Sequence, residues 1–272
     1  MEGYTFDYRL GYVRAECAFS GFDIIGDDRA PNGRIVTLGG YTTPEIARTG
    51  MSWVHALYKK TGGRYQIYNG CTDGYSSAQI LTMFIREAVL LKPKLVICFS
   101  GFYNIAYKLG FIKNKMDAEL IKSHPFSTPG QLDFYNKITS RFGLGNDEVF
   151  FGTENSLSAW ELWLYQMEQI NCLCAEFNIE FKTLLQPCVF SGIYQINDRE
   201  RSLICDSYKL SSEEVEKFRT RFQREYTLIK EGAKERDFFI DLSNVYDDCK
   251  DVYADASHVQ DRFITALTEN VL

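Results

Sequence analysis

Asp255 and His258 stand three residues apart near the C-terminus, in the stretch YADASH. Histidine titrates near neutral pH, so a histidine with a carboxylate close by in the sequence is a candidate for proton transfer. Because the spacing is common in proteins, it indicates chemistry only if other reactive groups lie beside it.

A second stretch of interest is RIVTLGGYTTPE, which spans residues 34–45. Its β-branched run ends at Gly39 and Gly40, and Tyr41 follows at once. The two glycines predict a tight turn with positive φ. The final TPE has the order of an N-cap, a proline at the first helical position and an acid in the first turn. We therefore expect a helix from there to about residue 60.

Short apolar runs rich in β-branched residues alternate with longer stretches of helical period along most of the chain. This alternation predicts a parallel sheet that is covered by helices on both faces. Besides the helix after residue 43, helices are expected to begin at 76 or 77 and to cover 159–177, 211–236 and a segment near the C-terminus. The expected strands are 35–38, 64–69, 94–100, 179–187 and 238–242.

The fold class is therefore α/β, a three-layer α/β/α sandwich with a parallel sheet of about five strands in flavodoxin-like order. We expect a single domain over residues 1–272. Between residues 105 and 158 the signals weaken, with prolines and glycines among short aromatic-rich pieces. Since a segment this long inside a compact domain usually carries function, we interpret 105–158 as a helical insertion that caps a pocket.

Composition excludes several classes of function. A net charge of −6 and a pI near 5.3 oppose binding to nucleic acid, which requires clustered lysine and arginine. No run of eighteen or more apolar residues and no basic-then-apolar leader is present, so we expect a cytoplasmic protein without a membrane span. The eight cysteines lack the paired spacing of a zinc or redox site, so neither metal nor cofactor is expected. The oligomeric state stays open.

Ligands of such sheets bind beyond the carboxyl ends of the strands. Polar or glycine-rich stretches follow four of the expected strands, and we expect them to meet at one cleft. They read LGGYTT, NGCTDGYSS, SGFYN and YADASH, at residues 38–43, 69–77, 100–104 and 253–258.

In this order the four stretches resemble the motifs LGGSTT, N-x-G-x-x-GYTS, GxND and YxDxxH of the SGNH, or GDSL, hydrolase family. The resemblance covers about residues 20–270, and the LQP at 185–187 is similar to that of polysaccharide-associated members. It implies an ester-hydrolase lineage and a small-molecule or carbohydrate ester as ligand. It also implies that His258 is the base, that Asp255 orients it and that the Gly74 N–H stabilises the oxyanion.

Tyr41 stands at the position where the family carries its serine nucleophile. A phenol oxygen lies several ångströms farther from the backbone than a serine hydroxyl, and near-attack geometry is lost with errors of about 1 Å. Ordinary acyl-enzyme chemistry is therefore not expected. Three explanations stay open: a degenerate protein that keeps the pocket for binding, an enzyme that uses Tyr41 or Cys71 with His258 and Asp255, or an esterase whose serine was engineered to tyrosine.

The third motif departs from the family as well. Aligned without a gap, it places Tyr103 where the family has an oxyanion-binding asparagine, whereas a shift of one residue brings Asn104 into that position. Both residues are candidates for the oxyanion site. The residues expected to contact the substrate are Gly40, Thr42, Tyr75 and Gln186.

Overall fold

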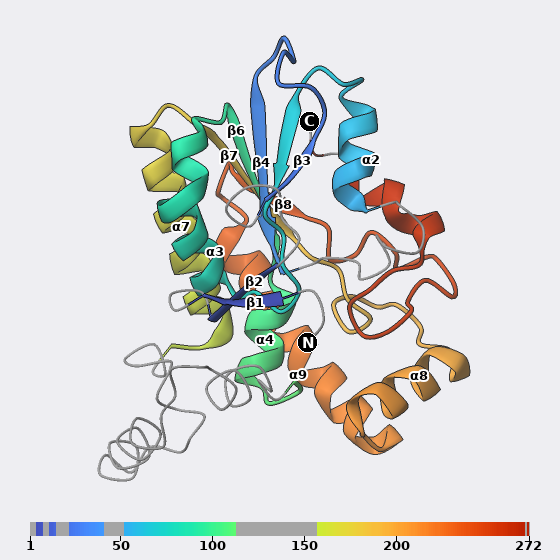
Figure 1. Cartoon of the computed structure of the whole chain (residues 1–272). Helices are drawn as coiled ribbons and strands as arrows, with labels where there is room; N and C mark the ends of the chain where they lie inside the picture. Colours follow the sequence, from blue (N-terminus) through green and yellow to red (C-terminus); the bar gives the residue numbers. More distant parts are fainter. Residues whose placement is uncertain are drawn as a thin grey trace, which may run out of the picture.

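The structure is a computed structural model that describes residues 4–7, 11–14, 22–40, 52–112, 157–269 and 271. Its centre is a six-stranded sheet with the order β3-β5-β4-β6-β7-β8 (Figure 1). The last five strands along this order are parallel, and β3 pairs antiparallel with β5 at the edge. The strands are β3 (Asp23–Ile25), β4 (Arg34–Gly39), β5 (Gln66–Asn69), β6 (Leu95–Ser100), β7 (Glu180–Leu185) and β8 (Phe239–Asp241).

Numbered along the chain, the five parallel strands lie in the order 2-1-3-4-5, which is the flavodoxin-like arrangement that the sequence predicts. The order reverses between β4 and β6, so the loops after these two strands leave the sheet in opposite directions. A crevice at this point is where doubly wound sheets bind ligands. The predicted fold class is therefore confirmed, with one additional antiparallel edge strand.

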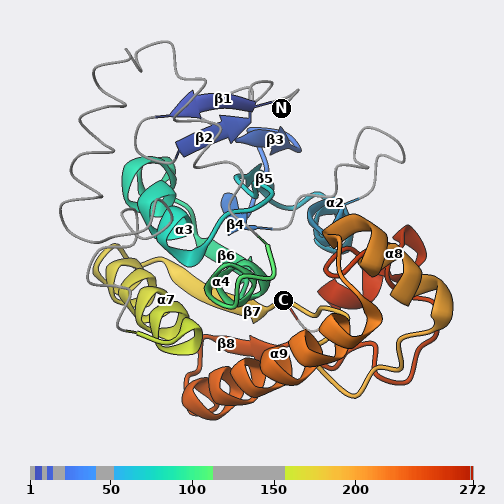
Figure 2. The same cartoon turned by 90° about the horizontal axis from the view of Figure 1, so that it is seen from below.

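Helices cover both faces of the sheet (Figure 2). On one face α2 (Trp53–Lys60) packs against η4 (Asp261–Thr268), a 3₁₀ segment near the C-terminus. On the other face α7 (Ala159–Glu176) packs between α3 (Ser77–Met83) and α9 (Ser212–Ala233). Two shorter helices, α4 (Phe102–Lys108) and α8 (Asp198–Tyr208), lie toward the end of the sheet where the strands terminate.

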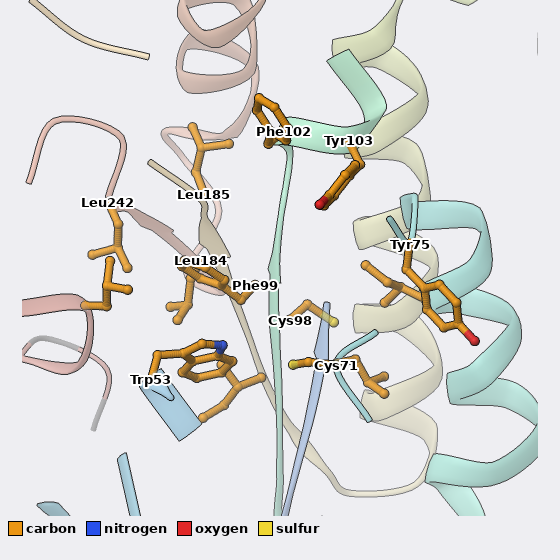
Figure 3. Close-up of a cluster of buried hydrophobic side chains, with 14 of the residues drawn as sticks. Trp53, Cys71, Tyr75, Cys98, Phe99, Phe102, Tyr103, Leu184, Leu185 and Leu242 are labelled. Carbon is orange, nitrogen blue, oxygen red and sulfur yellow. The ribbon is translucent and has the colours of Figure 1, made fainter. Parts of the chain in front are cut away.

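The core is one cluster of buried side chains on both faces of the sheet (Figure 3). Successive residues of β6 point to opposite faces, as expected for a strand. Phe99 packs on Trp53 of α2, with ring centroids 5.2 Å apart. Ser100 turns to the other face, where its Oγ accepts a 2.9 Å hydrogen bond from Nε1 of Trp163 in α7. The carboxyl end of β6 is thus fixed from both sides.

Local capping explains where the helices begin. Capping boxes start α7 at Ser158, α8 at Asn197 and α9 at Ser211, each with a glutamate three residues later. The helix predicted from residue 43 to residue 60 is wrong as a continuous helix. Ser52 is extended (φ −115°, ψ 168°) and its side chain accepts a hydrogen bond from the His55 N–H, so α2 begins at Trp53.

Other expectations also need correction. The helix after Ser76 ends at Met83 and continues as a π-helical turn over Phe84–Ala88 and a 3₁₀ turn over Val89–Leu91. The strand β3, the helices α4 and α8, and a small antiparallel hairpin of β1 (Tyr4–Asp7) and β2 (Gly11–Arg14) were not expected from the sequence. Most of the predicted insertion, from 113 to 156, lies outside the described residues, as does residue 43.

The glycines that end β4 serve close packing, and the prediction of positive φ is wrong for both. A Cβ on Gly39 would lie 2.2 Å from the carbonyl oxygen of Phe99 in β6. A Cβ on Gly40 would lie 2.5 Å from the ring of Tyr103 and 2.5 Å from the carbonyl oxygen of Tyr75. Because these two residues have no side chains, β6, the loop after β5 and α4 can all approach the end of β4.

We predict that Gly39→Ala lowers the free energy of unfolding by about 2 kcal/mol or more, because the new methyl group meets backbone and forces β4 and β6 apart. Urea denaturation measures the loss. Gly62→Ala is the matched control, since no atom lies within 4 Å of its Cβ and only its φ of +61° causes strain, at about 1 kcal/mol. Equal losses for both variants would contradict the close approach of the two strands.

Candidate functional site

The loop after β5 folds over the end of β4. The Thr72 N–H donates to the Gly39 carbonyl oxygen at 2.9 Å, and the Gly74 N–H lies 3.3 Å from the Gly40 carbonyl oxygen. Gly74 itself has a φ of +81°, a conformation that glycine adopts without strain. Three of the predicted stretches, those that follow β4, β5 and β6, therefore meet at one place.

Asp255 and His258 form the pair that the family resemblance implies. Nδ1 of His258 lies 2.5 Å from Oδ2 of Asp255, and the backbone N–H groups of Ser257 and His258 each donate to Oδ1 at 2.8 Å. Burial raises the pKa of Asp255, but the imidazole and the two backbone donors together outweigh this and hold the pKa below its ordinary value. The carboxylate is thus ionised at neutral pH and orients the ring.

The other nitrogen of the ring faces a second carboxylate, for which the sequence provided no role. Nε2 of His258 lies 4.0 Å from Oδ1 of Asp73, in the loop after β5. The pKa of Asp73 is raised by its burial, against the opposing effects of His258 and of hydrogen bonds from Tyr103 and Gly74. Asp73 falls on a variable position of the family motif. The sequence feature that could have indicated its role is that Asp73 directly precedes Gly74, the expected oxyanion donor.

Tyr103 points toward this carboxylate, and its hydroxyl donates a hydrogen bond to Oδ1 of Asp73. Asn104 points elsewhere: its side-chain oxygen accepts from the Ser77 N–H at 3.0 Å, and its amide donates to Oγ of Ser77 at 2.5 Å. Of the two candidates for the oxyanion position, Tyr103 therefore contacts Asp73, the carboxylate that faces His258, whereas Asn104 holds the first turn of α3.

The residues expected to contact substrate lie in different surroundings. Tyr75 is buried, and its hydroxyl points in a different direction from that of Tyr103 (Figure 3). Gln186 is fully buried at the end of β7, where its N–H donates to the Ser100 carbonyl oxygen at 2.8 Å. Cys71 is buried in the core near Cys98 (Figure 3), which is the position of a packing residue.

Gly40 packs against Tyr103, as described above. Tyr41 and Thr42 lie outside the described residues. Tyr107, which comes from the next turn of α4, donates its hydroxyl to the Gly74 carbonyl oxygen at 2.7 Å. The site that the structure brings together is therefore made of Asp73 and Gly74 from one loop, two tyrosines of α4, and the histidine pair.

A buried glutamate anchors the loop that carries the histidine. Oε1 of Glu200, at the start of α8, accepts hydrogen bonds from the Tyr194 hydroxyl at 2.6 Å and the Tyr253 N–H at 2.9 Å. The Tyr194 oxygen in turn accepts from the Val252 N–H at 3.0 Å. The sequence shows Glu200 only as the third residue of a capping box after Asn197, so its second role was not predicted.

The rest of the loop is held by backbone pairing. The Ala254 N–H donates to the His258 carbonyl oxygen at 2.8 Å, and the Val189 N–H donates to the Ala256 carbonyl oxygen at 2.9 Å. The backbone amide of Ala256 also hydrogen-bonds to Tyr208 at the end of α8. These contacts tie the histidine loop to the segments after β7 on both sides of Glu200.

Among the residues that the structure describes, no helix is long and apolar enough to cross a membrane. Within the same part of the chain, no three His, Cys, Asp or Glu side chains gather as they would around a metal ion.

No family model matches this sequence, and no curated protein is significantly similar to it. Among solved structures, an acetyl xylan esterase named AlAXEase matches with a TM-score of 0.47 and 11% identity, over 86% of this chain and 96% of that chain. The acetylxylan esterase Axe2 from Geobacillus stearothermophilus matches with a TM-score of 0.47 and 11% identity, over 90% and 92% of the two chains. A GDSL-like lipase from Parabacteroides merdae matches with a TM-score of 0.47 and 9% identity, over 87% and 92%.

We predict that Glu200→Gln lowers the free energy of unfolding by about 1–3 kcal/mol, because a buried amide cannot accept from every donor that the carboxylate satisfies. Glu214→Gln is the matched control, as Glu214 holds the same capping-box position at the exposed start of α9. Urea denaturation compares the two. A loss for Glu200→Gln no larger than that for Glu214→Gln would show that the contacts to the histidine loop contribute nothing.

We predict that Asp73→Asn raises the melting temperature at neutral pH. The pKa of Asp73 is raised from 3.8, so its ionised form is less favourable in the folded protein than in the unfolded chain. The gain should shrink as the pH falls through the folded-state pKa and vanish below about 3.8, where the carboxyl group is protonated in both states. Thermal melts from pH 3 to pH 8 follow the difference, with the exposed Asp248→Asn as control. A destabilised variant at pH 7 would contradict the prediction.

Proposed function

We propose that this chain is an SGNH-hydrolase-like protein of the carboxylic ester hydrolase lineage, repurposed to bind an acylated carbohydrate without serine esterase turnover. The observation that carries the proposal is the position of Asp73. In a serine hydrolase the free nitrogen of the histidine faces the nucleophile. Here Nε2 of His258 faces the carboxylate of Asp73 at 4.0 Å.

Electrostatics support the absence of turnover. Acyl transfer develops a negative charge on the carbonyl oxygen, which hydrolases stabilise with preorganised donors. Two carboxylates, Asp73 and Asp255, flank the imidazole in this chain. A like charge about 4 Å from a developing oxyanion costs roughly 1 kcal/mol in water and about 4 kcal/mol near a protein surface. The arrangement therefore opposes the step that an esterase must accelerate.

The groups around the imidazole support a sugar-like ligand. Tyr103 and Tyr107 of α4 lie with ring centroids 5.8 Å apart, and Tyr208 lies close enough to Asp73 and Asp255 for both charges to raise its pKa. Aromatic rings provide flat apolar surfaces, and carboxylates and phenols provide a few directed polar contacts. A sugar ring has apolar faces that can pack on aromatic rings and hydroxyl groups that can hydrogen-bond to carboxylates and phenols, so it suits this site.

A second candidate function rests on the histidine pair, whose 2.5 Å contact retains the geometry of an acid–base catalyst. In this alternative the chain is an active enzyme in which Tyr41 serves as general acid, general base or nucleophile, or an esterase whose serine was engineered to tyrosine. The burial of Cys71 favours Tyr41 over the thiol as the reactive group.

The decisive assay compares hydrolysis of p-nitrophenyl acetate and butyrate by the unaltered protein and by His258→Ala. We expect no turnover that depends on His258, because Tyr41 stands at the position of the family's serine and Asp73 lies 4.0 Å from the imidazole. A robust rate that the substitution abolishes would overturn the proposal.

Intact-mass measurement separates the two candidate functions. After incubation with an activated acyl donor, an adduct mapped to Tyr41 supports the enzyme, and its absence supports the binding protein. Tyr41→Ser tests the rest of the site. Esterase activity in this variant would show that Asp255 and His258 are still positioned to activate a serine. If Tyr41→Ser is inactive but gains activity when Tyr103→Asn is added, the tyrosine in the third motif is a second substitution that prevents esterase activity.

A further inference from the structure

The donors expected to stabilise an oxyanion are directed at a group of the protein itself. The Tyr103 hydroxyl donates to Oδ1 of Asp73, and the Gly74 N–H also hydrogen-bonds to the Asp73 carboxylate. Nε2 of His258 approaches the same Oδ1 from another side at 4.0 Å. Two donors, one from the loop after β5 and one from α4, thus converge on one carboxylate, and the imidazole lies beside it.

We propose that Asp73 is a built-in occupant of an acyl-oxygen site, and that a ligand carrying a carboxyl or carbonyl oxygen takes its place when the Asp73 side chain leaves. The carboxylate stands where the oxygen of a bound acyl group would accept from the Tyr103 hydroxyl and the Gly74 N–H, with the imidazole of His258 beside it. The inference concerns binding, so it holds or fails independently of whether the chain turns over any ester.

Asp73 is more exposed to solvent than the histidine that it faces. Its side chain is 35% exposed, whereas that of His258 is 13% exposed. Asp73 is therefore the more accessible of the two side chains, while the imidazole is held by Asp255. Tyr103 is also fixed, because its ring packs against Gly40 and against Phe102. Tyr103 and His258 are thus held in place by their neighbours, and Asp73 is more exposed than His258.

The charges around the site indicate which ligands displace Asp73 best. Asp255 lies on the far side of the imidazole, and Tyr208 and Tyr107 contribute no positive charge. In the described part of the chain, His258 is the basic side chain within 4.0 Å of Asp73. Burial raises the pKa of Asp73, which means that solvent suits the ionised group better than the site does. A neutral acyl group, which has the same oxygen without the charge, should therefore bind better than an anion.

The experiment uses the full chain with Asp73→Ala, which removes the occupant and leaves the donors. Acetamide and sodium acetate are the probes, since they have the same shape and differ in charge. We expect ¹H–¹⁵N spectra of Asp73→Ala to show saturable shifts at Gly74 and in the 253–258 loop. Affinity for acetamide should be at least about five-fold higher than in the unaltered protein, with dissociation constants of order millimolar, given the few atoms of the probe.

Three variants complete the test. Asp248→Ala removes an exposed carboxylate and should bind neither probe better than the unaltered protein. Adding Tyr103→Phe to Asp73→Ala should lower the gained affinity by removing one donor. Asp73→Ser replaces Asp73→Ala if the latter does not fold. A folded Asp73 variant that binds acetamide and acetate no better than the unaltered protein would overturn the proposal.

Discussion

The close approach of backbone at the end of β4 is the constraint on which the site depends. Gly39 lies against the Phe99 carbonyl and Gly40 lies against the ring of Tyr103 and the carbonyl of Tyr75. Side chains at these two positions would keep the loop after β5 and the first turn of α4 from meeting. Because neither glycine has one, Gly74 and Tyr103 reach the same point beyond the sheet, and His258 arrives there from the loop after β8.

Once these loops meet, the balance of charge determines what the site can do. His258 lies between Asp255 and Asp73, at 2.5 Å and 4.0 Å. The two carboxylates differ in the direction of their pKa shifts: Asp255 has two backbone donors and lies below its ordinary value, whereas burial keeps Asp73 above it. Paired groups whose pKa values are pushed apart often share a proton-handling task. Here the two carboxylates lie on either side of the imidazole, so a further negative charge at this point is disfavoured.

The sequence predicted the sheet because its strands are short, apolar and bounded by glycine or proline, so the parallel order followed from their alternation with helices. It predicted the Asp255–His258 contact because that contact is local. It missed Asp73 and Glu200 because the importance of each carboxylate comes from residues far along the chain: Asp73 meets Tyr103, and Glu200 meets Tyr253. The start of α2 at Ser52 was missed because the start signal at residues 43–45 was extended through Gly50 into the helical pattern that follows.

The capping box that starts α8 shares its carboxylate with the histidine loop. Oε2 of Glu200 accepts from the Asn197 N–H at 3.2 Å, while Oε1 accepts from Tyr194 and Tyr253. Fraying of the first turn of this helix would therefore withdraw the anchor of a segment about fifty residues later. The two should open and close as one cooperative unit in native-state hydrogen exchange. The first turn of α8 must therefore be folded for the loop that carries His258 to keep its position.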